Sequence, residues 1–130
     1  MTTKVLIADD SQFARNVLKD ILLKCQNRFQ IIEANSAAKT IEMFKKEKPD
    51  FVLLDIVMPE SEEEGVTVLE KIMQSRPETS VIMVTAVGND AMIKKCMELG
   101  AKDYITKPFE EKRVISAIDK YLDERATNAE

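Results

Sequence analysis

Histidine is absent from the 130 residues of this chain. The protein therefore has no imidazole for acid–base catalysis, for binding a metal ion or for carrying a phosphohistidine. Tryptophan is also absent, and only two cysteines are present. Because Cys25 and Cys96 fit no metal-binding spacing, we expect both to be reduced thiols in a cytoplasmic protein.

Long apolar runs and an excess of positive charge are missing as well. No run approaches the roughly 18 residues of a membrane-spanning helix, and no signal peptide opens the chain. The formal net charge is −4, which disfavours nucleic-acid binding. We therefore expect a cytoplasmic location, with neither a membrane nor a nucleic acid among the partners. The length and the 45% content of hydrophobic residues suit one domain with its own core.

Short apolar runs alternate with segments of helical length along the whole chain. The runs predict strands at residues 4–8, 30–34, 51–54, 80–84 and 103–105. Strict alternation of this kind favours a parallel sheet covered by helices. The expected fold class is α/β: a flavodoxin-like, five-stranded parallel sheet with strand order 2-1-3-4-5 and helices on both faces.

The segments between the strands carry helix start and stop signals. Ser11, Ser36 and Asn89 are each placed to cap a helix, and Gly100 is placed to end the helix that Asn89 begins. Pro108 stands where the last helix is expected to start. In the first helix, the apolar residues at 13, 17, 21 and 25, spaced by four, predict the buried face.

Polar side chains follow four of the five expected strands. In an open parallel sheet, ligands bind beyond the carboxyl ends of the strands, where the strand order reverses. The second strand lies at the sheet edge in this order, so we expect it to contribute nothing to the site. Three carboxylates at one place repel each other unless a cation or a proton joins them, and oxygen ligands alone favour Mg²⁺. The converging residues are Asp9, Asp10, Asp55, Thr85 and Lys107.

These residues match the motifs of a known family, and the chain resembles response-regulator receiver domains, in particular stand-alone CheY-like members. The resemblance covers residues 3 to about 123. On this basis we expect a receiver domain at residues 1–124 and a polar C-terminal tail at 125–130. The matching motifs are Asp9-Asp10, Asp55 with the following Met58-Pro59, Thr85-Ala86 and Lys107-Pro108.

The resemblance implies a phosphoryl-accepting signalling protein rather than an enzyme. Asp55 would accept a phosphoryl group from a sensor histidine kinase or a phosphotransfer protein. Thr85 and Lys107 would bind the phosphoryl oxygens, and the Lys107–Pro108 peptide bond would be cis. The implied Mg²⁺ ligands are Asp10, Asp55 and the backbone carbonyl of Val57, with Asp9 acting mainly through a bound water.

The output would be phosphorylation-dependent binding to another protein, and chemotaxis is one pathway that fits. Thr85 and Tyr104 would act as the switch. The expected contact face combines the helix after Asn89, the strand at 103–105 and the last helix. This face includes Lys94, Lys95, Lys102 and Lys112.

Two departures from the family pattern stand out. The loop after Met58-Pro59 is two residues longer than usual and strongly acidic at residues 60–64. Such glutamates favour the positive N-terminus of the next helix, or they shape partner choice or cation binding. Val57 and Val87 occupy positions that influence hydrolysis of the acyl phosphate in relatives, and neither side chain can orient a water molecule.

Three other functions fit parts of the pattern. A Mg²⁺-dependent phosphatase or phosphotransferase of the haloacid-dehalogenase kind also uses an aspartyl nucleophile, but it needs a second Asp where Val57 stands. A flavodoxin would need a Ser/Thr-rich phosphate loop after the first strand and aromatic residues around the flavin. This chain has Asp9-Asp10 at that loop, no tryptophan and only two tyrosines, so the flavodoxin interpretation fails. An interaction module that works without phosphorylation stays open, because an intact site need not be used.

Overall fold

A computed structural model describes residues 2–25, 29–58 and 64–128, and the side chains as far as Glu124. Five strands and five helices alternate along these residues, as the sequence pattern predicts. The strands are β1 (Thr3–Ala8), β2 (Phe29–Ala34), β3 (Phe51–Leu54), β4 (Ser80–Thr85) and β5 (Asp103–Thr106). The helices are α1 (Gln12–Lys24), α2 (Ala37–Glu47), α3 (Gly65–Ser75), α4 (Asp90–Glu98) and α5 (Glu111–Asn128).

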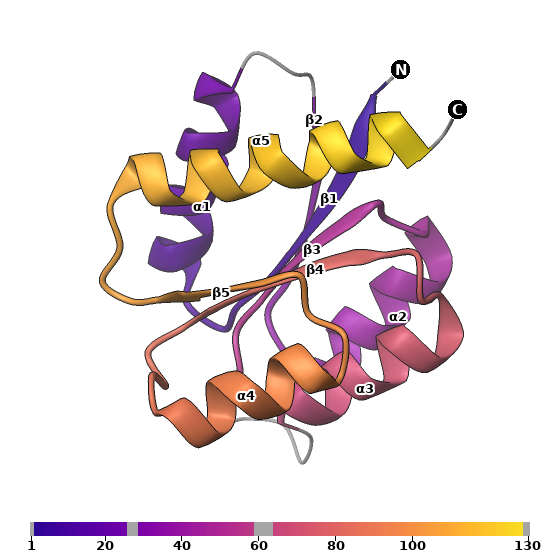
Figure 1. Ribbon diagram of the computed structural model, residues 1–130, viewed down its shortest axis with the longest axis vertical. Coiled ribbons are helices and arrows are strands. Elements are labelled where there is room, and N and C mark those ends of the chain that lie inside the picture. Colours follow the sequence, from indigo (N-terminus) through magenta and orange to yellow (C-terminus); the bar gives the residue numbers. More distant parts are fainter. Residues whose placement is uncertain (1, 26–28, 59–63, 129–130) are drawn as a thin grey trace.

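All strands are parallel and form one sheet in the order β2-β1-β3-β4-β5, which confirms the predicted topology. Helices α1 and α5 cover one face, and α2, α3 and α4 cover the other (Figure 1). The sheet therefore separates two apolar cores. One core joins the sheet to α1 and α5 through residues such as Leu18 and Ile118, and the other joins it to α2, α3 and α4 through residues such as Phe44 and Leu69.

The predicted helix caps are confirmed. The side chains of Ser11, Ser36 and Asn89 accept hydrogen bonds from backbone N–H groups within the first turn of α1, α2 and α4, at 3.2, 3.1 and 2.8 Å. Gly100 follows α4 with φ of +114°, a conformation that glycine adopts without strain. These local signals fix where three of the helices begin.

The predicted buried face of α1 is wrong at its first residue, because Phe13 is 79% exposed. The buried residues of this helix are Arg15, Leu18, Ile21 and Leu22. Residues four apart drift by about 40° around a helix at each step, so a run of four such residues leaves the face it began on. The covered face follows a 3.6-residue period instead.

The last helix begins at Glu111, three residues after Pro108, and helical backbone continues through Asn128. It thus covers the first four residues of the segment expected as a polar tail. Among the described helices, none combines the length and the apolar character that a membrane span requires. The acidic loop at 60–64 lies outside the described residues except for Glu64, which is exposed and precedes α3.

Candidate functional site

The sheet register places the ends of β1 and β3 at one level, and β4 and β5 run two residues further in the same direction. Ala8 pairs with Leu54, and Thr85 pairs with Thr106. The residues that follow these pairs therefore lie together at the carboxyl end of the sheet. They are Asp9, Asp55 and Lys107. The backbone supports this arrangement, since the N–H of Asp55 donates to the carbonyl of Ala8 at 3.0 Å.

Three carboxylates lie close together at the carboxyl end of the sheet. Asp9, Asp10 and Asp55 each offer an oxygen atom, and these oxygens lie within 4.8 Å of one another. Asp9 and Asp55 are buried, with 2% and 6% of their surface exposed, whereas Asp10 faces solvent. Buried carboxylates this close require a compensating cation. The cluster predicted from the strand ends is thus present.

Lys107 supplies positive charge from the end of β5. Its ammonium group lies 2.6 Å from Oδ2 of Asp9 and 3.1 Å from Oδ2 of Asp55. The other carboxylate oxygens accept backbone hydrogen bonds: Oδ1 of Asp9 from Ser11 at 2.9 Å, and Oδ1 of Asp55 from Val57 at 3.2 Å. The Lys107–Pro108 peptide bond is cis, as the family resemblance implied.

Burial and ion pairing shift the pKa values in this cluster. Burial raises the pKa of the Asp9 carboxyl, and the hydrogen bond from Lys107 offsets this only in part. Burial opposes the charge of Lys107, but the hydrogen bond with Asp9 and the charges of Asp55 and Asp9 outweigh it, so the pKa of Lys107 is raised. Lys107 thus stays charged, while burial opposes the charge of the Asp9 carboxylate.

Thr85 and Tyr104 are linked through the backbone of Val87. The hydroxyl of the fully buried Thr85 accepts a hydrogen bond from the N–H of Val87 at 3.3 Å. The hydroxyl of Tyr104 donates to the carbonyl of the same residue. Burial is the largest cause that raises the pKa of Tyr104 to about 12, with further contributions from the neighbouring Cys96 and Asp55, so its hydroxyl keeps the proton that it donates. Tyr104 already lies inward, packed in the core beneath α4.

Gly65 allows α3 to begin directly against the site. A Cβ atom at this position would lie 2.2 Å from the backbone oxygen of Asp55 and 2.5 Å from the Cα of Ile56. Backbone atoms cannot move aside as the end of a flexible side chain can. A residue without a side chain is therefore needed here, and the N–H of Gly65 donates to the carbonyl of Ile56 at 2.8 Å.

The structure adds two residues that the sequence reasoning missed. Arg15 of α1 is buried, and it donates hydrogen bonds to the backbone carbonyl of Asp9 at 2.6 Å and to Glu33 of β2 at 2.9 Å. Among the described residues, β2 sends no side chain into the carboxylate cluster, as expected for the edge strand. It supports the site indirectly, because Glu33 contacts Arg15 and the carbonyl of Ala34 accepts a hydrogen bond from the N–H of Asp9.

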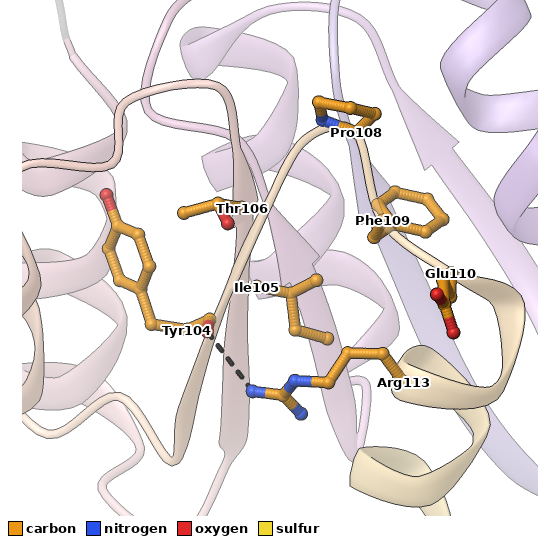
Figure 2. A pocket seen from close by; sticks show the side chains of 7 residues that line it. All are labelled: Tyr104, Ile105, Thr106, Pro108, Phe109, Glu110 and Arg113. Carbon is orange, nitrogen blue, oxygen red and sulfur yellow. Dashed lines mark hydrogen bonds between the residues drawn. The ribbon is translucent and has the colours of Figure 1, made fainter.

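A shallow groove of about 360 Å³ lies beside the site, along β5 and the start of α5. In Figure 2, the ring of Tyr104 projects to one side of β5, and the side chain of Arg113 lies on the other. Arg113 donates to the backbone carbonyl of Tyr104 at 3.3 Å. The predicted contact lysines at 94, 95, 102 and 112 are all exposed on α4, α5 and the turn before β5.

The donor set fits a hard divalent cation. Three carboxylates offer oxygen ligands, and two of them are held in place by backbone N–H groups. Mg²⁺ binds through one or two carboxylates and keeps several waters, and such binding suits a cluster with one solvent-facing member. Val57 is the residue whose N–H bonds to Asp55, so its carbonyl belongs to the same short turn.

Comparison with known proteins agrees with this geometry. The family model for the response regulator receiver domain matches residues 5–119. The chain is 42% identical to the chemotaxis protein CheY of Bacillus subtilis over 123 residues, which cover 94% of this chain and 99% of that protein. It is 39% identical to the CheY of Thermotoga maritima, with 92% and 98% covered.

Solved structures give the same result. A CheY-like receiver domain protein from Methanospirillum hungatei superposes with a TM-score of 0.87 at 27% identity, covering 98% of this chain and 99% of that one. The CheY of Borrelia burgdorferi, solved as a complex with CheX, BeF3 and Mg²⁺, gives a TM-score of 0.84 at 32% identity, covering 92% and 89%. With its sheet order, its strand-end carboxylates and these relatives, the chain belongs to the response regulator receiver domain family of two-component signalling.

Proposed function

We propose that this chain accepts a phosphoryl group on Asp55 and passes the signal on through phosphorylation-dependent protein binding. The observation that carries the proposal is the bridge from Lys107 to two buried carboxylates. Lys107 places one fixed positive charge between Asp9 and Asp55, 3.1 Å from the acceptor. A phosphoryl group bonded to Asp55 brings its negative oxygens within reach of that charge.

The transfer itself follows from the position of Asp55. A carboxylate oxygen of Asp55 attacks the phosphorus atom of a phosphohistidine, the phosphorus–nitrogen bond breaks, and the imidazole nitrogen keeps the electron pair. Lys107 turns part of its bonding from Asp9 and Asp55 to the new phosphoryl oxygens. The hydroxyl of Thr85 stands at the end of β4, and it exchanges its bond with Val87 for one to a phosphoryl oxygen.

We further propose that the cluster holds Mg²⁺ through Asp10, Asp55 and the carbonyl of Val57, with Asp9 acting mainly through a bound water. When bound, Mg²⁺ neutralises charge on the group being transferred. The residues fit this task because two carboxylates are buried and prepositioned, and the third leaves the site open to water. Before the transfer, Lys107 keeps its contact with Asp9 in this scheme, and Asp55 contacts both cations.

The expected partners are a sensor histidine kinase or a phosphotransfer protein and, downstream, a protein that binds the face of α4, β5 and α5. The groove along β5 and the exposed lysines of that face support the second expectation. Chemotaxis is the pathway that fits, since the similar proteins from three organisms above are chemotaxis proteins by name or bind CheX. A cytoplasmic location and a domain boundary near residue 124 stay predictions.

No catalytic turnover of another substrate is part of this proposal. An aspartyl phosphatase needs a general acid two residues after its nucleophile, where this chain has Val57, a side chain without a proton to give. Val57 is 49% exposed, and its side chain carries no polar atom. An interaction module that works without phosphorylation would show equal partner affinity before and after labelling of Asp55.

The test is phosphoryl transfer from purified histidine kinases charged with radiolabelled ATP. We expect at least one kinase to label the chain in the presence of Mg²⁺, and we expect EDTA to stop the transfer. Asp10→Ala should require a much higher Mg²⁺ concentration for the same rate, because it removes the solvent-facing ligand. Transfer that continues undiminished in EDTA would contradict the metal site, and labelling of Asp55→Asn would contradict the acceptor.

A further inference from the structure

Arg15 is the most unusual side chain near the site, because its charge is buried without facing the carboxylate cluster. It is 8% exposed, although it stands only one turn from the start of α1. Burying a guanidinium is costly unless its donors are satisfied. Here all three nitrogens donate: Nη1 to the carbonyl of Asp9 at 2.6 Å, Nε to Glu33 at 2.9 Å and Nη2 to Gln12 at 2.7 Å.

The carbonyl of Asp9 is the one that matters for the site. It belongs to the peptide unit that joins Asp9 to Asp10, and a peptide unit is planar. Fixing the direction of this carbonyl therefore fixes the plane of the peptide unit, and with it the positions of the backbone nitrogen and the Cα atom of Asp10. The preceding peptide unit is held as well, since the N–H of Asp9 donates to the carbonyl of Ala34 at 3.1 Å. The backbone of Asp9 is thus clamped on both sides.

Asp10 depends on this clamp more than its neighbours do. The carboxylates of Asp9 and Asp55 accept backbone hydrogen bonds and contact Lys107. Among the described residues, none donates a hydrogen bond to the Asp10 carboxylate. Its position is set by the backbone alone, and Arg15 is the side chain that orients that backbone.

Glu33 holds Arg15 in turn. Its Oε1 accepts from Arg15 at 2.9 Å, and its Oε2 accepts from Lys19 at 3.1 Å. A carboxylate between two cations keeps its charge and fixes the guanidinium in the plane that reaches Asp9. The edge strand β2 thereby acts on a site that its own side chains do not enter.

We propose that Arg15, held by Glu33, is a positioning residue that sets the affinity of the site for Mg²⁺ by fixing the Asp9–Asp10 peptide. The inference rests on the proposed Mg²⁺ site and adds residues that bind neither the metal nor the phosphoryl group. Loss of such outer partners of metal ligands lowers metal affinity by about tenfold or more. Lysine cannot replace Arg15, because one ammonium group cannot reach Asp9, Glu33 and Gln12 in the same plane.

The test titrates Mg²⁺ alone into the full chain by calorimetry, and it uses variants matched to separate positioning from stability. Arg15→Lys should raise the dissociation constant for Mg²⁺ about tenfold, and Glu33→Gln should raise it in the same direction by less. Lys24→Gln removes a cation of the same helix that pairs with Glu111 and contacts neither Glu33 nor Asp9, so it should bind Mg²⁺ as the wild type does. Ile21→Val is the stability control. It removes a buried methyl group from the same helix, and Ile21 lies further along the chain from Asp9 than Arg15 does.

A purely structural role for Arg15 predicts that Mg²⁺ affinity follows thermal stability. In that case Arg15→Lys and Ile21→Val would bind Mg²⁺ with the same dissociation constant if they lower the unfolding temperature by the same amount. That result would overturn the proposal. Unchanged Mg²⁺ binding in both Arg15→Lys and Glu33→Gln would overturn it as well. If Arg15→Lys weakens Mg²⁺ binding but the wild type takes no phosphoryl group from acetyl phosphate, the inference stands and the proposed function fails.

Discussion

The ammonium group of Lys107 lies closer to Asp9, at 2.6 Å, than to Asp55, at 3.1 Å. The lysine at the end of β5 is therefore bonded most tightly to a carboxylate that accepts no phosphoryl group. This arrangement keeps two buried negative charges compensated, and it leaves the second oxygen of Asp55 in a weaker, backbone-only contact with Val57. Lys107 also contacts Oδ2 of Asp9 and of Asp55, two carboxylates of the cluster proposed to bind a divalent cation.

Replacing Lys107 separates its two effects. Lys107→Met keeps the long stem but removes the charge, so Mg²⁺ no longer meets a like charge at Asp9 and Asp55. We expect Mg²⁺ to bind roughly tenfold more tightly, which corresponds to about 1.4 kcal/mol. Phosphoryl acceptance should nevertheless slow, because a positive charge beside Asp55 is lost. Calorimetry and intact mass measure the two effects, and Lys102→Met, an exposed lysine, serves as control. Weaker Mg²⁺ binding in Lys107→Met would contradict the account.

Tyr104 should carry the signal through its hydroxyl. Tyr104→Phe keeps the buried ring and removes the donor to the Val87 carbonyl. We expect normal phosphorylation of Asp55, but smaller amide shifts in α4 when beryllofluoride and Mg²⁺ are added, followed by NMR. Tyr121→Phe is the matched control, because its hydroxyl makes the same kind of bond, to the Lys102 carbonyl at 2.6 Å. Equal α4 shifts in Tyr104→Phe and wild type would place the coupling elsewhere.

Val57 and Val87 should make the phosphorylated form long-lived. Neither side chain can hold a water molecule in line with the acyl phosphate. A double variant, Val57→Asn with Val87→Glu, introduces polar groups at both positions, and we expect it to lose the phosphoryl group roughly tenfold faster. The time course of intact mass after removal of acetyl phosphate measures this rate. A decay rate identical to that of the wild type would refute the assignment.

Asp103 and Arg113 tie β5 to α5 beneath the contact face. Two hydrogen bonds join them, at 2.9 and 3.1 Å. Burial alone would raise the pKa of Asp103, but the hydrogen bonds from Arg113 and the Tyr104 N–H outweigh it and lower that pKa below 3.8. The pair is partly exposed, so Asp103→Asn should cost only about 1 kcal/mol of unfolding free energy at pH 7.

The pH dependence of that loss follows from the lowered pKa. A carboxyl whose folded pKa lies below its unfolded value stabilises the protein fully above the unfolded value, here 3.8. The gap between the wild type and Asp103→Asn should hold from neutral pH down to that point and then shrink as the pH falls through the folded pKa. Asp119→Asn, which removes an exposed carboxylate of α5, serves as the control variant. Urea unfolding at several pH values measures both, and a gap that widens in acid would contradict the sign.

The site residues could be predicted from the sequence because a parallel sheet brings strand ends together. Once the strand order is right, Asp9, Asp55 and Lys107 must lie at one edge, whatever the detail of the packing. The helix caps were equally accessible, because each depends on one side chain and the next three residues. Local chemistry and strict topology thus account for what the sequence reasoning found.

The support around the site was not accessible in the same way. The contact of Arg15 with Glu33 joins residues 18 apart, and it depends on how α1 lies across the end of β2. An arginine early in an amphipathic helix is normally exposed, so neither composition nor periodicity marks this one as buried. Phe13 shows the converse, an apolar residue that the packing of α1 leaves in solvent.

The most direct measurement is the intact mass of the chain after incubation with acetyl phosphate and Mg²⁺. The account predicts one added phosphoryl group on the wild type and on Asp20→Asn, which removes an exposed carboxylate of α1, and none on Asp55→Asn. Labelling of Asp55→Asn to the level of the wild type would contradict the central claim, and so would a wild-type chain that gains no phosphoryl group under conditions in which Mg²⁺ is shown to bind.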